Sequence, residues 1–230
     1  MQFDKVFKLG KPTQTSLWMV DIVGYSKITN EAVQEELVKN LFSCVYDSMN
    51  EIKEEIYQYG DIGSKRELSA DDATVIWTGD GAIIALKSPF DLYTPLKLSF
   101  HFMQFWERKE WTLYKNEKCD WNITPKLHIA AHIGECRWLS TPTLRSPLFE
   151  VSNCFGVDIN ILARISTFST SNGEFVLSEK YYQYLCPNNS YIFNVKIGAL
   201  KCNIRVTEMM EDKVKGKGEN KFEYRFFEFE

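Results

Sequence analysis

The sequence predicts an α+β fold, in which helices pack on one face of a single β-sheet. A short apolar stretch, residues 17–20, is typical of a buried strand, and it leads into Asp21 and a glycine turn. A long amphipathic helix follows, and two β-rich runs then flank Gly79-Asp80-Gly81, which is a hairpin pattern. The periodicities along the rest of the chain complete the order βαββαβ followed by αβββ, which indicates this fold class.

The long helix is predicted to begin after Thr29 or Asn30, either of which can cap it, and to end at Gly60. Its apolar side chains recur at spacings of three and four and therefore share one face: Val33, Leu37, Leu41, Val45, Met49, Ile52 and Ile56. Residues 1–14 are interpreted as a polar N-terminal arm, and residues 15–230 as one domain. The other elements expected are a loop at 60–72, a hairpin at 74–86, a helix at 90–114, a strand at 126–134, a loop at 138–152, a helix at 154–168, a strand at 174–178, a short helix at 180–185, and strands at 191–195, 201–208 and 222–229.

Length, composition and net charge limit the classes of protein to which this chain can belong. The chain has 230 residues, 44% hydrophobic and 25% charged, which suits one domain with a sizeable core. A formal net charge of −4 gives no electrostatic footprint for nucleic acid or an anionic membrane, so neither partner is expected. No run of about 18 apolar residues and no basic-then-apolar leader is found, which predicts a cytoplasmic protein. Free thiols are expected for the six scattered cysteines: Cys44, Cys119, Cys136, Cys154, Cys186 and Cys202.

Two aspartates at the predicted edge of the sheet suggest a site that binds divalent cations. An Asp at a strand end, such as Asp21, is by itself typical of an ordinary turn. If the hairpin lies beside the first strand, however, Asp80 comes next to Asp21, and two carboxylates that close repel unless divalent cations bridge them. Strand-Asp plus hairpin-Asp is the layout of two-metal phosphoryl-transfer sites. The backbone N–H groups after Asp21 are candidate phosphate donors: Val23, Gly24, Tyr25 and Ser26.

Four segments together resemble the catalytic domain of class III nucleotide cyclases. They are Asp21-Ile22-Val23-Gly24-Tyr25-Ser26, Gly79-Asp80-Gly81, Asn153-Cys154-Phe155-Gly156-Val157-Asp158-Ile159-Asn160-Ile161-Leu162-Ala163-Arg164, and Val214-Lys215-Gly216-Lys217-Gly218. They occur in the family's order and span nearly the whole chain. The resemblance implies a ferredoxin-like βαββαβ core with an added C-terminal αβββ unit.

The same resemblance implies that a ribose 3′-hydroxyl attacks its own α-phosphate, closing a 3′,5′-cyclic nucleotide and expelling pyrophosphate. Asp21, Asp80 and the Ile22 carbonyl would then hold two divalent cations, Mn²⁺ or Mg²⁺. By the same resemblance the remaining roles are ribose orientation by Asn160, contact with the α-phosphate by Arg164, and contact with the terminal phosphates by Lys215. Without it, Asn160 and Arg164 also fit an ordinary polar helix face, and Lys215 a solvated turn. In this family the aspartates come from one subunit and the Asn, Arg and Lys from the other, so a homodimer with two shared sites is expected.

The residues that would read the base depart from the family pattern. Adenylyl cyclases place a Lys where this chain has Ile76 and an Asp where it has Asn153, and the Glu and Cys typical of guanylyl cyclases do not fit either. A catalytic shell with altered base readers resembles the stand-alone bacterial pyrimidine cyclases of anti-phage defence, whose cyclic nucleotide activates a separate effector. Met19, Cys154 and Phe155 would line the pocket. The Asn153 amide can serve uracil or cytosine, and UTP is preferred over CTP because no carboxylate is in evidence to receive the cytosine amine.

Several alternatives remain open from the sequence. One is an adenylyl cyclase with an atypical base pocket, and another is a catalytically silent, cyclase-like binding module. His128 and His132 share one face of the strand at 126–134, and without a third ligand they are interpreted as structural rather than metal-binding. The family's His-x-Gly is matched by residues 132–134, but Glu135 stands where a basic residue is common, which leaves Arg137 as an open candidate for phosphate binding.

Overall fold

The computed structural model describes residues 8–59, 73–87, 92–118, 124–140, 153–169, 174–213 and 221–230. Its helices are α1 (Glu31–Tyr59), α2 (Thr94–Arg108), α3 (Thr112–Lys118), α4 (Val157–Ile165) and α5 (Glu179–Leu185), with short 3₁₀ turns η2 (Tyr25–Lys27) and η3 (Ser166–Phe168). Its strands are β1 (Lys8–Ile22), β2 (Ala73–Trp77), β3 (Gly81–Lys87), β4 (Leu127–Ser140), β5 (Asn153–Phe155), β6 (Phe175–Ser178), β7 (Ile192–Ile197), β8 (Leu200–Val206), β9 (Met210–Lys213) and β10 (Lys221–Phe229).

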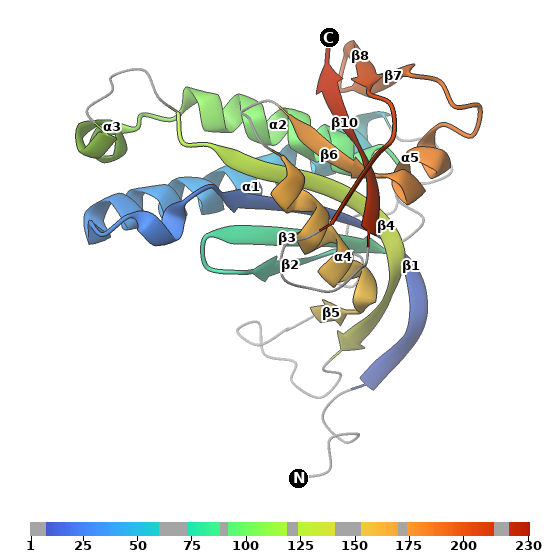
Figure 1. Cartoon of the computed structure of the whole chain (residues 1–230), viewed down its shortest axis with the longest axis horizontal. Helices are drawn as coiled ribbons and strands as arrows, with labels where there is room; N and C mark the ends of the chain where they lie inside the picture. The colour runs from blue at the N-terminus through green and yellow to red at the C-terminus, as the bar shows by residue number, and fades with distance from the viewer. Residues whose placement is uncertain are drawn as a thin grey trace.

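These strands form one sheet, in the order β2-β3-β1-β4-β6-β10-β8-β7 (Figure 1). Each of the first four strands in this order is antiparallel to its neighbour among them, and the four are connected as a ferredoxin-like βαββαβ core. β6 joins β4 in parallel and β10, β8 and β7 follow antiparallel, while β5 pairs with the far part of β4 and β9 with β10. The predicted α+β class and its ferredoxin-like core are confirmed.

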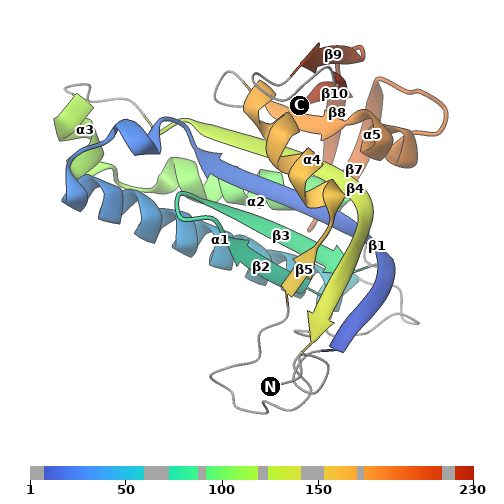
Figure 2. The ribbon, with the colours of Figure 1, turned by 60° about the horizontal axis from the view of Figure 1, so that its bottom comes forward.

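The sheet is covered on both faces, whereas helices were expected on one. Along β1, Trp18 and Val20 point to the core under α1 and α2, and the Trp18 indole N–H donates to Ser99 Oγ on α2 at 2.9 Å. The alternate residues, Leu17 and Met19, point to a second core that is covered by α4. Figure 2 shows α4 crossing β1 and β4, with α1 on the other side of the sheet. The prediction was wrong for α4, because two-sided burial gives a continuous apolar run that does not say which helix covers which face.

The first strand starts earlier than predicted. Residues 8–14 of the supposed arm belong to β1, because β4 continues to Ser140 and supplies a partner for them. Gly10 and Pro12 are unusual inside a strand, and the pairing of β1 with β4 accommodates them by a register shift between Leu9 and Pro12. The long helix begins as expected, and of the two candidate caps Asn30 acts, since its Oδ1 accepts the Ala32 N–H at 3.0 Å.

Two predicted helices are divided by tertiary contacts. The segment 90–114 becomes α2 and α3, with Lys109 extended between them and Trp111 turned onto Trp106 at 4.4 Å between ring centroids. The segment 154–168 becomes β5, then α4. Gly156 separates these two because a Cβ at this position would lie 2.9 Å from the Glu135 carbonyl oxygen. β9 was not predicted.

The described cysteines are free thiols, as predicted, and Cys119 lies outside the described residues. None of the helices in the described part of the chain is long and apolar enough to cross a membrane.

Candidate active site

Asp21 and Asp80 meet at the end of β1. Asp21 lies opposite Gly81 of β3, and Asp80 directly precedes that glycine in the β2–β3 turn. The turn is fixed to the strand because the Ile22 N–H donates to the Asp80 carbonyl oxygen at 3.0 Å. The two acids that the sequence placed at one sheet edge are therefore neighbours.

The glycines of the turn make this approach feasible. A Cβ on Gly81 would lie 2.7 Å from the Val20 carbonyl oxygen and 2.8 Å from Asp21 Oδ1, closer than real Cβ contacts. Gly79 has a φ of 95°, a backbone conformation that L side chains rarely adopt. The Gly-Asp-Gly triplet thus delivers an acid against the strand end with no side chain in the way.

The acid pair is electrostatically unsatisfied. Burial, and then the nearby charge of Asp80, raise the pKa of Asp21 to about 7. A divalent cation would relieve both effects, so the two carboxylates fit a metal site. Within the described ranges, no three His, Cys, Asp or Glu side chains gather closely enough to hold a metal ion. Further ligands would therefore come from a backbone carbonyl, such as that of Ile22, from water or from phosphate oxygens.

The turn after Asp21 offers fewer amides than expected. The Val23 N–H donates to the Lys126 carbonyl oxygen at 2.9 Å, which corrects the expectation that this amide is available to phosphate. Gly24 adopts a left-handed conformation, with a φ of 74°, and η2 begins after it. The N–H groups of Tyr25 and Ser26 stand in the first turn of η2, where helix geometry provides no internal acceptor.

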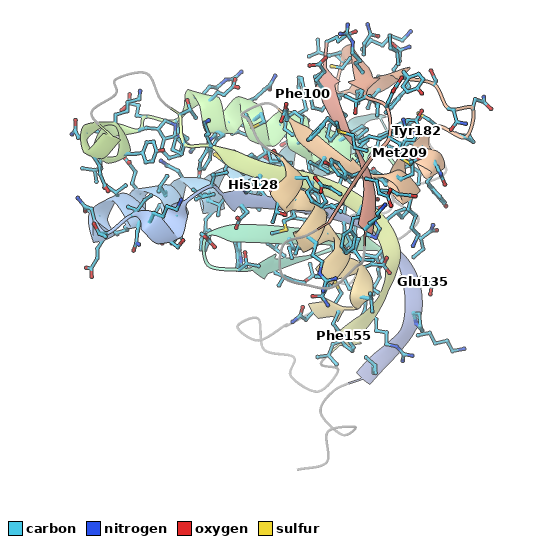
Figure 3. The ribbon with its side chains drawn as sticks, viewed as in Figure 1. Phe100, His128, Glu135, Phe155, Tyr182 and Met209 are labelled. Atoms are coloured by element: carbon cyan, nitrogen blue, oxygen red, sulfur yellow. The ribbon has the colours of Figure 1, made fainter. Side chains whose placement is uncertain are left out.

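The residues predicted to contact the base form two groups, one on β1 and β2 and the other on the short strand β5. Met19, Ile83 and Ile76 form a row across β1, β3 and β2, and Met19 is only 7% exposed in the core beneath α4. β2 also contacts β5. In β5 the burial alternates, so Cys154 points into the core while Asn153 and Phe155 point outward. Phe155 is 48% exposed, and Figure 3 shows its side chain on β5, at the opposite end of the sheet from α3.

Asn160 and Arg164 lie on the outer side of α4. The helix buries Leu162 and Ile165, and residues 160 and 164, four apart, share a different face. The Arg164 guanidinium stands 5.7 Å from the ring centroid of Phe222 on β10. This contact brings Arg164 beside the β9–β10 hairpin, whose connecting residues 214–220 contain Lys215 and lie outside the described residues.

The acids and the α4 residues are not joined within one chain. Among the described residues, no hydrogen bond or ion pair connects Asp21 or Asp80 to Asn160 or Arg164. Asp21 lies opposite His128 on β4, whereas the first turn of α4 lies over Gly134 and Glu135, where Asp158 accepts the Glu135 N–H. At ~3.3 Å per residue, that separation is about 20 Å along the strand. The chain that follows α4 comes closer to the acids, because the Ser169 backbone is hydrogen-bonded to the His128 ring. Figure 3 shows His128 and Glu135 well apart on β4, on either side of α4.

Sequence reasoning missed the polar contacts that hold α4. The ring of His132 lies between Ser178 Oγ, 2.6 Å from Nδ1, and Asp158 Oδ1, 2.8 Å from Nε2, which gives this histidine a structural role. Asp158 was assigned no role from the sequence beyond its place in the segment 153–164. Its spacing of four and seven from Leu162 and Ile165, which are buried, could have indicated that it faces inward. Arg137 is exposed opposite Phe155, and its role stays open.

No family model matches the sequence, and no curated protein matches it. Solved structures do. The chain is similar to the guanylyl cyclase Cya2, with a TM-score of 0.60 and 14% identity over 96% of this chain and 94% of that chain. It is similar to the catalytic core of a rhodopsin-guanylyl cyclase with converted specificity in complex with ATPalphaS, with a TM-score of 0.58 and 12% identity over 97% and 98%. A non-canonical dimeric guanylyl cyclase domain of the RhoGC fusion protein from the aquatic fungus Blastocladiella emersonii gives a TM-score of 0.52 and 10% identity over 98% of each chain. At these identities the likeness shows the fold alone, and the chain has the fold of class III nucleotide cyclase catalytic domains.

Proposed function

We propose that this chain is the catalytic domain of a nucleotide cyclase, which converts a ribonucleoside triphosphate to its 3′,5′-cyclic monophosphate and pyrophosphate. One observation carries the proposal. In a chain with the cyclase fold, Asp21 and Asp80 are held side by side at a strand end, the described residues form no ion pair with either, and the pKa of Asp21 is raised to about 7. Such a pair has no stabilising role in the apo protein and is suited to cations and phosphates.

In this proposal Asp21 and Asp80 hold two divalent cations, with the Ile22 carbonyl as a further ligand. When bound, such cations make the 3′-hydroxyl more acidic and neutralise the phosphates. Asp21 gives up its proton as it becomes a ligand, and the amides of Tyr25 and Ser26 would donate to phosphate oxygens.

Asn160 and Arg164 hold the ribose and the α-phosphate. Their place on the outer face of α4 leaves both side chains accessible to a ligand, and the Phe222 ring supports one side of the Arg164 guanidinium. A guanidinium fork matches the oxygens of an α-phosphate as charge develops there. Lys215 would complete this group from the neighbouring hairpin.

The distribution of these residues supports a homodimer with shared sites. Among the described residues, no hydrogen bond or ion pair joins the acids to Asn160 or Arg164 of the same chain, so in this proposal a second copy completes each site and two-fold symmetry builds two. A monomer should be inactive.

The proposed substrate is a pyrimidine triphosphate, UTP before CTP. In the base-reading positions, Ile76 carries no charge, and Asn153 offers an exposed amide with both a donor and an acceptor. The resemblance to bacterial defence cyclases suggests that the product is a second messenger for a separate effector. An adenylyl cyclase with an atypical pocket and a silent cyclase-like module are the competing functions.

The test is to incubate the pure protein with Mn²⁺ and each of the four ribonucleoside triphosphates separately, and to identify cyclic products by chromatography and mass spectrometry. Cyclic UMP is expected as the main product. Asp80→Asn serves as the inactive control, and Glu51→Gln, which removes an exposed charge on α1, as the active one. Cyclic AMP as the main product would refute the pyrimidine assignment, and no product from any triphosphate would favour the silent module.

A further inference from the structure

Two polar networks meet at the start of α5. One runs from Ser178, the N-cap of this helix, to α4, and the other from Glu179, the next residue, to β10. The helix α4 carries Asn160 and Arg164, and β10 forms one arm of the hairpin whose connection carries Lys215. The first turn of α5 is therefore bonded to both elements that would supply the second half of the site.

The first network has a fixed direction. The ionised Asp158 carboxylate only accepts, so His132 carries its proton on Nε2 and donates it to Asp158 Oδ1 at 2.8 Å. Nδ1 of the neutral ring is then an acceptor. The Ser178 hydroxyl donates to it at 2.6 Å, while Ser178 Oγ accepts the Tyr181 N–H at 3.2 Å. Burial lowers the pKa of His132, and although burial alone would raise that of Asp158, its hydrogen bonds to His132 and the Glu135 amide lower it. A neutral imidazole and an ionised carboxylate agree with this direction.

Asp158 is also locked to β4. Its second oxygen accepts the Glu135 N–H at 3.0 Å, and its side chain fills the space over Gly134, where a Cβ would lie 2.1 Å from Asp158 Cγ. The Lys180 ammonium, 58% exposed, lies 3.6 Å away. The first turn of α4 is thus held to the sheet by one carboxylate.

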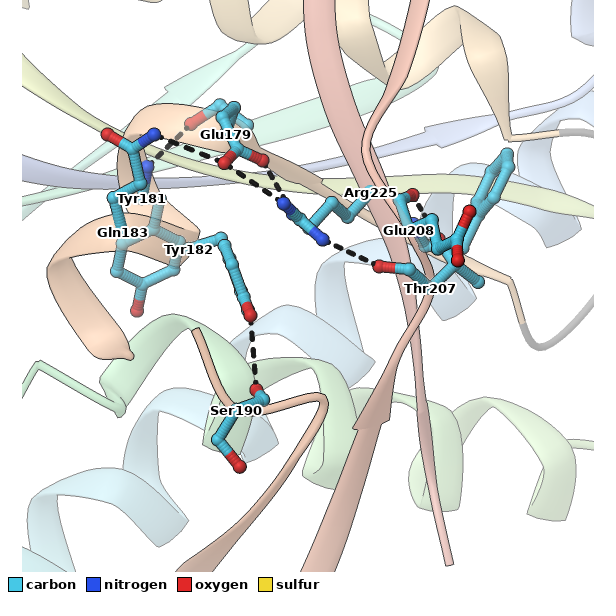
Figure 4. A network of polar contacts seen from close by, with 10 residues as sticks. Glu179, Tyr181, Tyr182, Gln183, Ser190, Thr207, Glu208 and Arg225 are labelled. Carbon is cyan, nitrogen blue, oxygen red and sulfur yellow. Dashed lines mark hydrogen bonds and ion pairs between the residues drawn. The ribbon is translucent and has the colours of Figure 1, made fainter. Parts of the chain in front are cut away.

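The second network is an ion pair removed from water, drawn in Figure 4. Arg225 donates to Glu179 through Nε at 2.5 Å and Nη2 at 3.1 Å, and their side chains are 9% and 8% exposed. Arg225 Nη1 donates to the carbonyl oxygen of Thr207, which lies between β8 and β9, at 3.0 Å, and the guanidinium lies 4.0 Å from the centroid of the Tyr182 ring. The base of the β9–β10 hairpin is thereby tied to α5.

We propose that these residues position the catalytic groups of α4 and the hairpin relative to each other. The set is named the α5 anchor and consists of His132, Asp158, Ser178, Glu179 and Arg225. The inference rests on the proposed function, and none of the five residues touches substrate. A displacement of about 1 Å of a reacting group can cost ~10²-fold in rate, so loosening the anchor should lower kcat although every catalytic side chain is present.

The test uses Asp158→Asn in the full chain. Its volume is the same, but one of its two oxygens becomes an NH₂ donor. That NH₂ either meets the Glu135 N–H, donor against donor, or faces His132 Nε2, which accepts only if the ring proton moves to Nδ1 and the Ser178 hydroxyl turns to accept it. In either case a hydrogen bond of Asp158 is lost or reversed. With Mn²⁺ and the triphosphate that wild type converts best, kcat is expected to fall about 10- to 100-fold, while KM changes less than about threefold. Hydrogen exchange should accelerate in α4 and β10 and stay unchanged in α1. Glu135→Gln, which removes the neighbouring exposed charge and keeps its amide, is the matched control and should match wild type.

Wild-type kcat in a folded Asp158→Asn protein would overturn the inference, and so would exchange that accelerates equally in α1, which would mean general loosening. If Asp158→Asn does not fold, Ser178→Ala, which breaks the chain at its α5 end, carries the same two measurements. Failure of the proposed function looks different, because wild type would then form no cyclic nucleotide from any triphosphate. The exchange comparison would still test the anchor in that case.

Discussion

Two regions of this molecule remove carboxylates from water, and they do so in opposite ways. At the end of β1, Asp21 faces Asp80, and the pKa of Asp21 rises to about 7 through burial and like charge. At the start of α5, Glu179 receives two hydrogen bonds from Arg225, and Asp158 receives one from His132. Paired acids hold a fold together, whereas an unpaired acid couple destabilises the apo protein and persists where a ligand supplies the missing charge. On this ground we propose a ligand site at the Asp21–Asp80 couple and a structural role for the α5 anchor.

The largest effect is expected from breaking the unpaired couple. Asp21→Asn or Asp80→Asn should lower turnover at least ~10³-fold, since removing even one charge-stabilising donor costs roughly 10²–10³-fold. Neither variant should lose stability, because each relieves repulsion and opens no cavity. Steady-state rates with saturating Mn²⁺ measure the loss of turnover, and urea denaturation measures the stability. Near-wild-type turnover in either variant would refute the two-metal assignment.

Breaking the paired couple should do the reverse. Arg225→Met leaves Glu179 buried without a partner, and the free energy of unfolding should fall by about 3–5 kcal/mol. Adding Glu179→Met in the same chain should recover much of that loss, because the uncompensated charge is then gone. Urea denaturation of the two variants measures this. A single variant as stable as wild type would show that the ion pair contributes nothing.

The acid couple was predictable from the sequence because its determinants are local. A strand that ends in Asp21, and a Gly-Asp-Gly turn between two β-rich runs, become neighbours as soon as the hairpin pairs with the strand. The ferredoxin-like core follows from the same strand and helix periodicities. Asn30 as a cap is likewise a property of a few consecutive residues.

The α5 anchor was not predictable, because it joins residues from four distant parts of the chain. Nothing in the sequence around His132, Asp158 and Arg225 indicates that their hydrogen bonds lead to the first turn of one helix, α5. The early start of β1 depends on the far end of β4 in the same way, and the division of the helix at Gly156 depends on contact with Glu135. Tertiary contacts decided each of these against local propensity.

A mixed dimer sharpens the comparison between the acids and α4. Asp80→Ala and Arg164→Ala homodimers should both be inactive, for different reasons. If the sites are shared, a mixed dimer has one site with both lesions and one with neither, so random co-expression should restore about a quarter of wild-type activity, by two-fold symmetry. Differently tagged subunits, purified in tandem, verify that heterodimers form. Verified heterodimers with no activity would mean that both residues act within one subunit.

The smallest effect is a pH dependence confined to the acid couple. In metal-free protein the pKa of Asp21 is about 7, against an ordinary value of 3.8 in the unfolded chain. Below 3.8 both states bind the proton, and Asp21 costs nothing. As pH rises toward 7 the unfolded chain releases the proton and the folded chain keeps it, so stability falls, and above 7 the full penalty is present. In EDTA, the stability gain of Asp21→Asn over wild type should therefore grow between about pH 4 and pH 7 and then level off. Urea denaturation across this range measures it, and a gain independent of pH would mean that Asp21 is ionised throughout and that the repulsion in the couple is already relieved by the protein itself.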